Sequence, residues 1–346
     1  MMKIAKIVMV AASLFLGACG GGDTTTSTPW KIAGDNFFRS VTSVDGGVVA
    51  IGDHGPTGYA KVVKFNANGT LAWRNESLPG DAVRAEAVAG HAYILRVHDP
   101  LNRDFGYGDV YVDKVDARNG SVVASTFLGS NLGAVALSAD SIEILVSVLD
   151  PDAWLFHLYR LDLDGNLAAG NPIITTSNGI RGIDTTSDSI FVAGDAAQSA
   201  TIARYSRSGN LLWSRTISPG PDAANSGIGI AASGSSVYVI GLSHSLVDLT
   251  PYTTFFRKYD VDGNLLGTSP YGGAEIIIGP QGELYVASGG PTGPRRLDAD
   301  GNLVWAGNSY GNSVAYLNGV LVVAASPDLA GYDAETGAQL FGTPRF

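Results

Sequence analysis

Cysteine is almost absent from this chain of 346 residues, since Cys19 is the only one. No intramolecular disulfide can form, and no second thiol is available for redox chemistry. Positive charge is also scarce: 22 Lys and Arg residues face 32 Asp and Glu residues, which gives a formal net charge of −10. A surface of that sign repels the phosphates of nucleic acids. We therefore expect no nucleic-acid partner.

Sequence signatures of catalysis are missing as well. The five His residues show no metal-site spacing, and there is no Gly-x-Ser-x-Gly elbow, Walker loop or His-Glu-x-x-His motif. Three Asp-x-Asp-Gly-Asn runs begin at Asp162, Asp260 and Asp298, but each has Leu at the sixth position, where a calcium-binding EF-hand loop has Gly. We interpret these runs as tight turns. We expect no cofactor, and an enzyme is the less favoured interpretation.

The N-terminus has the features of an export signal. Lys3 and Lys6 precede an apolar stretch, residues 7–16, which is too short to span a bilayer but has signal-peptide length. The run Leu16-Gly17-Ala18-Cys19 resembles the lipobox of bacterial lipoproteins. This resemblance implies that the Cys19 thiol is acylated, with a palmitate-type chain, and that the lipid anchors the protein in a membrane. The alternative is an ordinary secretory signal with an incidental cysteine.

Three regions follow from this interpretation: a signal peptide at residues 1–18, a lipidated Cys and flexible tether at residues 19–29, and a folded body at residues 30–346. The tether is rich in Gly, Ser and Thr, a composition that makes linkers flexible. By resemblance to enterobacterial sorting, Gly20 after Cys19 favours the outer membrane over the inner one. Removing the signal peptide leaves a formal charge of −12.

The folded body contains a segment that recurs seven times. It consists of a basic residue, an apolar residue, Asp or Asn (Ser206 in one copy), two further residues, Gly and an apolar run that often ends in Trp, as in residues 64–73, 204–213 and 296–305. The turn glycines of the copies are Gly69, Gly120, Gly165, Gly209, Gly263, Gly301 and Gly337. A β-rich run precedes each copy, for example residues 142–146 and 237–241.

Repeats spaced by 36 to 54 residues leave room for four short strands each, which is typical of propeller blades. We therefore predict an all-β fold, a seven-bladed β-propeller with four antiparallel strands per blade. The Trp that ends the fourth strand is predicted to pack between neighbouring blades. The recurring basic residues are interpreted as structural, pairing with neighbouring strands.

Residues 332–341 resemble the PQQ-like propeller repeat, and the Asp-Gly-Asn copies resemble the bacterial seven-bladed-propeller (SBBP-type) repeat. The resemblance implies the fold and says little about function, because the matched residues are structural. Quinoprotein dehydrogenases have eight blades and a vicinal cysteine pair, so the resemblance does not extend to the quinone. Ring closure stays open, since either residues 30–32 or residues 338–341 could supply the last outer strand.

Four long segments, residues 98–108, 149–154, 214–227 and 244–252, fall at one end of the predicted blades. Loops on a rigid scaffold often carry binding residues, although these segments could also be tolerated insertions. The candidate binding face contains Arg103, Asp104, Tyr107, Asp152, Trp154, Asp248 and Tyr252.

The predicted inner strands carry three acids, Glu86, Asp184 and Glu275. The leading hypothesis is a non-catalytic, membrane-anchored scaffold that binds an envelope or surface protein or another ligand. The alternative is a hydrolase or lyase, cation-dependent or not, that uses these acids at the central channel. A minority alternative is a component of outer-membrane protein assembly, because a propeller lipoprotein with PQQ-like repeats serves there.

Overall fold

The structure is a computed structural model that describes residues 38–52, 58–99, 107–218, 223–245, 253–289, 292–325 and 328–342. Cys19, the tether and the candidate strand at residues 30–32 lie outside the described residues. The described part is all-β, and its strands belong to five four-stranded sheets and one seven-stranded sheet. No helix in it is long and apolar enough to cross a membrane.

Each sheet is built from strands that follow one another in the sequence. The first sheet contains β1 (Phe38–Val44), β2 (Gly47–Gly52), β3 (Tyr59–Asn66) and β4 (Leu71–Pro79). The seven-stranded sheet contains β5 (Asp81–Val88), β6 (His91–His98), β7 (Gly108–Asp116), β8 (Val122–Ala139), β9 (Ile144–Asp150), β10 (Leu155–Leu161) and β11 (Ile174–Thr176).

The remaining four sheets repeat the order of the first. They contain β12 (Gly182–Thr185), β13 (Ser189–Ala196), β14 (Ser199–Ser206) and β15 (Leu211–Ile217); β16 (Ala223–Ser233), β17 (Ser236–Ser245), β18 (Thr253–Asp260) and β19 (Leu265–Ser269). They continue with β20 (Glu275–Ile278), β21 (Leu284–Ala287), β22 (Arg295–Leu297) and β23 (Leu303–Ala306); β24 (Ser313–Leu317), β25 (Val320–Ala325), β26 (Asp328–Asp333) and β27 (Gln339–Phe341).

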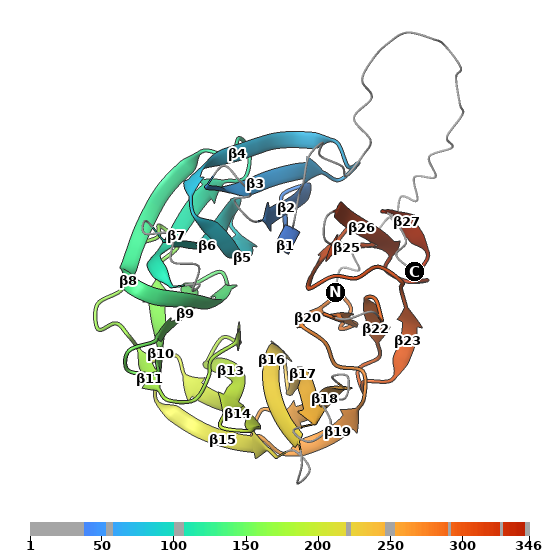
Figure 1. The fold of residues 1–346 in the computed structure, drawn as a ribbon. Helices are drawn as coiled ribbons and strands as arrows, with labels where there is room; N and C mark the ends of the chain where they lie inside the picture. The colour runs from blue at the N-terminus through green and yellow to red at the C-terminus, as the bar shows by residue number, and fades with distance from the viewer. Residues whose placement is uncertain are drawn as a thin grey trace, which may run out of the picture.

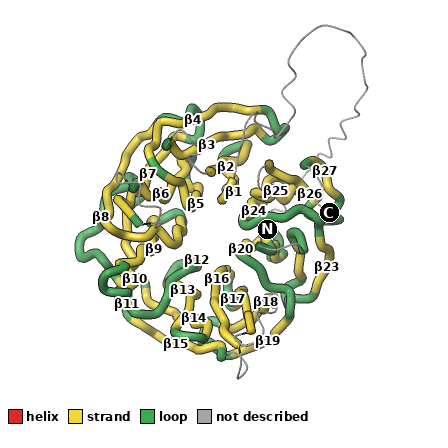
Figure 2. The backbone as a smooth tube through the Cα atoms, viewed as in Figure 1, coloured by secondary structure: helices red, strands yellow, loops and turns green. Residues whose placement is uncertain are grey.

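The sheets are arranged radially around a central axis, with their first strands innermost (Figures 1 and 2). This arrangement is a β-propeller. The long strand β8 belongs to two parts of the ring: up to Leu132 it pairs with β7, and from Gly133 it pairs with β9. All strand pairs are antiparallel, so the loops after each second and fourth strand open on one face and the tight turns open on the other.

The β-rich runs identified in the sequence lie in β2, β6, β9, β13, β17, β21 and β25, which are almost wholly buried. The run at residues 142–146 begins two residues too early, because β9 starts at Ile144 and Ile142 is exposed. The reason is local: the Asp140 carboxylate accepts hydrogen bonds from the backbone N–H groups of Ile142 and Glu143 and holds them in a turn.

The recurring basic side chains clamp each sheet to the next. The Lys64 ammonium donates to the carbonyl of Ala117 over 2.9 Å, and the Lys258 ammonium pairs with Asp300 at 2.8 Å. In each case the acceptor lies in the turn between the third and fourth strands of the following sheet. The predicted structural role is confirmed, with the next turn as the partner rather than a neighbouring strand.

The Trp residues of the repeats make a second contact with the same turns. The indole N–H groups of Trp73, Trp213 and Trp305 donate to Ala117, Val261 and Ala334 at 2.9, 2.8 and 3.2 Å. The turn glycine lies flat on the ring: Gly337 has φ +75°, and a Cβ there would come within 2.6 Å of Trp305. Packing of Trp between blades is thus confirmed, and it explains why Trp and Gly recur together.

The ring closes between the first and last sheets. The Val41 N–H donates to Ser313 Oγ at 3.0 Å, joining β1 to β24. Residues of both sheets, Phe38, Val41, Ala315 and Leu329 among them, share one buried cluster. β27 supplies the fourth strand of the last sheet from the C-terminal side. Of the two segments that the sequence offered for the last outer strand, residues 338–341 therefore form it.

Candidate functional site

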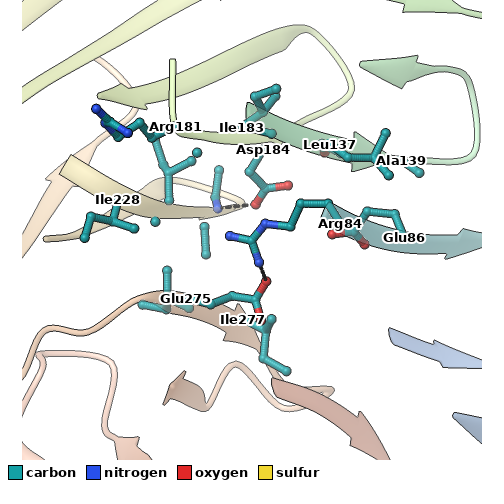
Figure 3. Close-up of a pocket in the computed structure, with 18 of the residues that line it drawn as sticks. Arg84, Glu86, Leu137, Ala139, Arg181, Ile183, Asp184, Ile228, Glu275 and Ile277 are labelled. Atoms are coloured by element: carbon teal, nitrogen blue, oxygen red, sulfur yellow. Dashed lines mark hydrogen bonds and ion pairs between the residues drawn. The ribbon is translucent and has the colours of Figure 1, made fainter. Parts of the chain in front are cut away.

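The innermost strands enclose a cavity of about 290 Å³ on the axis of the ring. Backbone and apolar side chains form most of its wall, and the charged groups on it are Arg84, Glu86, Arg181, Asp184 and Glu275 (Figure 3). All three acids proposed from the inner strands therefore line one cavity. Arg84 was missed, although its position two residues before Glu86 puts both side chains on the same side of β5.

Arg84 reaches across the axis to Glu275 (Figure 3). Its Nη1 lies 2.6 Å from Glu275 Oε1, and both side chains are largely buried. The other carboxylate oxygen, Oε2, accepts the Val314 N–H at 2.7 Å. Glu275 thus links β20 both to the opposite strand β5 and to the neighbouring strand β24, and its negative charge is compensated.

Asp184 is engaged by the backbone. Its Oδ2 accepts the Ala232 N–H of the next inner strand at 2.6 Å, and its Oδ1 accepts the Thr185 N–H at 2.8 Å. Burial nevertheless raises the pKa of Asp184 to about 6, and the two amide hydrogen bonds oppose that shift. The carboxyl therefore links β12 to β16 through its hydrogen bond with Ala232.

Glu86 is the one acid of the cavity without such a tie. In the described part of the chain no hydrogen bond to its carboxyl is found. Burial raises the pKa of Glu86 to about 8; the negative charges of Glu275 and Asp184 act in the same direction, and Arg84 opposes them. Glu86 is thus a neutral acid at pH 7, able to donate a hydrogen bond or a proton to a molecule in the cavity.

A second cavity of about 390 Å³ lies next to the first, and Glu86 and Glu275 line both. Within the described residues no group of three or more His, Cys, Asp or Glu side chains is placed to hold a metal ion. Asp184 and Glu275 already bind amides and a guanidinium, which leaves few free lone pairs.

The candidate binding face is only partly within the described residues: Arg103, Asp104, Asp248 and Tyr252 lie outside them. Tyr107, Asp152 and Trp154 come together at one corner of the long-loop face. The Tyr107 ring is half-buried against Gly133 of β8. Two residues before Gly133, the Asn131 side-chain amide donates to Asp152 Oδ2 at 3.0 Å.

Trp154 ends the turn between β9 and β10. The Asp150 carboxylate accepts the N–H groups of Asp152 and Ala153 at 2.9 and 3.2 Å, which fixes the turn. Trp154 then adopts φ +54°, a left-handed conformation that suits Gly or Asn and is strained for a bulky side chain. The side chain is 69% exposed, so a large apolar ring projects into solvent from a rigid base.

Comparison with solved structures agrees with the fold. A chain of the mitotic checkpoint complex superposes with a TM-score of 0.59 at 13% identity, covering 94% of this chain and 98% of that one. Virginiamycin B lyase from Staphylococcus aureus gives 0.61 at 12% identity (86% and 95% covered). The Cps50 (Swd1) β-propeller domain from Myceliophteria thermophila gives 0.57 at 9% identity (86% and 97%).

Similarity at these identities shows the β-propeller fold alone. No protein-family model and no curated protein matches the sequence.

Proposed function

We propose that this protein is a lipoprotein of the cell envelope, anchored through Cys19, whose propeller is a non-catalytic scaffold that binds another envelope or surface component. Residues 1–18 are its signal peptide, residues 19–29 its tether and residues 30–346 a propeller of seven blades. The count of seven follows if β8 supplies the outer strand of one blade and the inner strand of the next. The outer membrane is the favoured location, on the basis of Gly20.

The observation that carries the scaffold proposal is Trp154 with its surroundings. The hydrogen bonds of the turn fix the backbone under Trp154, so only its side chain loses freedom on binding, and aromatic anchors dominate the energetics of interfaces. Tyr107 and Asp152 at the same corner add an aromatic edge and a polar contact.

The test is crosslinking in intact cells with a photoreactive amino acid at position 153, an exposed site beside Trp154. The control is the same amino acid at Asn68, which is exposed in the turn between β3 and β4, on the opposite face. We expect crosslinked products from position 153 alone, and we expect the Cys19→Ser variant to lose both its membrane association and these products. Equal products from both positions would contradict the assignment of the binding face.

A second candidate function rests on Glu86. A carboxyl with a pKa near 8 on the wall of the central cavity has the properties of a general acid, which favours the hydrolase or lyase alternative at the central channel. For the cation-dependent form, no suitable ligand group is found in the described residues. The enzyme alternative ranks second because Asp184 and Glu275 already serve as ties between strands. The outer-membrane assembly role remains a minority proposal.

A further inference from the structure

We propose that the central cavity binds a small organic cation, a primary alkylammonium ion, through the Glu86 carboxylate. This site lies on the axis of the ring and is separate from the long-loop face on which the scaffold proposal rests. It also requires no reaction, so it goes beyond both candidate functions. Three properties of the cavity support it: its space, the balance of its charges and the chemistry of its wall.

The two cavities on the axis adjoin each other, with Glu86 between them. Glu86, Glu275 and Ile277 line both cavities, whose volumes are about 290 and 390 Å³. Sites for small organic ligands typically have volumes of about 300–1,000 Å³. The second cavity reaches the tight turns, because its wall includes Ser43 near the end of β1 and Pro280 in the turn between β20 and β21. A small molecule can therefore approach Glu86 from the tight-turn face.

The charged and titratable groups on the walls of the two cavities are Arg84, Glu86, Arg181, Asp184, Glu275 and Tyr316. Both guanidinium groups are already paired, Arg84 with Glu275 and Arg181 with Asp195. Asp184 accepts two backbone amides, which carry no net charge. Glu86 has no hydrogen-bond partner among the residues that the structure describes. The ionised Glu86 therefore lacks a compensating cation, and the space for one lies in the cavity.

A proton compensates Glu86 when no other cation does. Burial and the negative charges of Glu275 and Asp184 raise the pKa of Glu86 to about 8, against the opposing charge of Arg84. An ammonium group beside the carboxylate favours its ionised form. Binding of the cation should therefore release the Glu86 proton to solvent, and the affinity should increase as the pH rises towards 8.

The wall of the cavity suits both ends of an alkylammonium ion. β5, β12, β16 and β20 each stand at the edge of a sheet, so backbone groups on their free edges point to the axis. Carbonyl groups there can accept the N–H donors of an ammonium group that Glu86 does not bind. Ile228 and Ile277, which are partly exposed and line the cavity (Figure 3), provide apolar surface for a short alkyl chain.

The test is isothermal titration calorimetry of the full-length protein, purified in a neutral detergent, with butylammonium, 1,4-diaminobutane and 1-butanol. We expect at least one amine to bind, and we expect no binding of 1-butanol, which has the length of butylammonium without its charge. In buffers of different ionisation enthalpy at pH 7, the wild type should release about one proton per bound amine. Its Kd should fall about tenfold from pH 6 to pH 7 and level off above pH 8.

Glu86→Gln removes the charge and keeps the size of the side chain. We expect it to bind the amine at least about tenfold more weakly, because a charge-assisted hydrogen bond is lost, and to release no proton. Glu76→Gln is the matched control: it is the same substitution at an exposed pair with Arg74 on β4, and it should behave like the wild type.

Three results would overturn the inference: no binding of either amine, binding of 1-butanol as tight as that of the amines, or equal affinity of Glu86→Gln and the wild type. Proton release is measured on the wild type, so this part of the test does not depend on the folding of a variant. If crosslinking at position 153 traps a protein while neither amine binds, the scaffold proposal stands and the cation site is refuted.

Discussion

At the scale of single residues, position in the ring determines what each acid does. Glu86, Asp184 and Glu275 lie at similar places on inner strands and line one cavity. Glu275 is neutralised by Arg84, Asp184 accepts two backbone amides, and Glu86 has neither. Burial without a partner favours the neutral form of a carboxyl. The three carboxyl groups therefore have three different sets of partners, and burial raises the pKa of Glu86 further than that of Asp184.

Glu86 makes the stability of the protein depend on pH with a defined sign. Its pKa rises from 4.5 to about 8 on folding, so between these values the folded protein holds a proton that the unfolded chain has released. The contribution of Glu86 to stability is complete below pH 4.5 and is lost as the pH rises to 8. Asp184, whose pKa rises from 3.8 to about 6, acts with the same sign in the lower part of this window.

We expect the wild type to lose free energy of unfolding between pH 5 and pH 8, and Glu86→Gln to lose much less. At pH 8 the variant should be the more stable by an amount on the order of a few kcal/mol, because Gln stays neutral. Urea unfolding at pH 5, 6.5 and 8 measures this. Glu76→Gln, at an exposed pair with Arg74 on β4, is the control and should keep the wild-type slope. Equal slopes for Glu86→Gln and the wild type would contradict the prediction.

At the scale of elements, the turns hold neighbouring sheets together. The turn between β14 and β15 carries Arg207, whose Nη1 lies 2.5 Å from Glu143 Oε1 and whose Nη2 lies 2.6 Å from Asp140 Oδ2. Its Nε also donates to the Thr186 carbonyl at 3.0 Å. Arg207 thereby joins three turns from adjacent parts of the ring. The buried Glu143 depends on it for part of its compensation.

Replacing Arg207 should therefore lower the free energy of unfolding more than replacing most surface arginines does. We expect Arg207→Ala to lower the free energy of unfolding by about 2 kcal/mol, because hydrogen bonds to charged, part-buried groups are lost. Arg118→Ala is the matched control: Arg118 also pairs with an Asp, but its side chain is 82% exposed, and such pairs contribute little. Urea unfolding of both variants measures this difference. Similar decreases in the free energy of unfolding for both would refute the special role of Arg207.

At the scale of the whole molecule, closure of the ring determines whether the sheets unfold together. Open repeat arrays can lose their terminal units separately. Here β1 and β24 are joined by the Val41–Ser313 hydrogen bond and by a shared buried cluster that includes Leu329. A closed ring has no terminal repeat, so damage at the closure should destabilise every sheet.

Leu329→Ala tests this cooperativity, because Leu329 is fully buried at the closure. Removal of a buried Leu side chain typically costs 2–5 kcal/mol, and we expect about 3 kcal/mol here. Trp213 on β15 is half-buried in a sheet away from the closure, so its fluorescence reports on a distant part of the ring. The urea midpoints from Trp fluorescence and from circular dichroism should shift together. A separate early transition by circular dichroism alone would show that the closure opens independently.

The sequence by itself determined the repeating architecture. Each turn before a fourth strand is encoded locally by an Asp, an Asn or, at Ser206, a Ser that bonds nearby amides and by a glycine that adopts positive φ, as the turns at Asp260 and Asp298 show. Each buried second strand is a short apolar run. The Trp and basic residues recur because every sheet meets the next in the same way. Such signals are short in range and appear once per repeat, so a single sequence displays them.

Only the tertiary structure decided how the unique residues meet. The Arg84–Glu275 pair joins positions 191 residues apart, and the raised pKa of Glu86 follows from burial beside those two charges. The sequence placed Trp154 on a long loop, but its left-handed backbone and its polar neighbours arise from the folded turn and from β8. These features depend on closure of the ring and on contacts between distant segments, which no periodic pattern encodes.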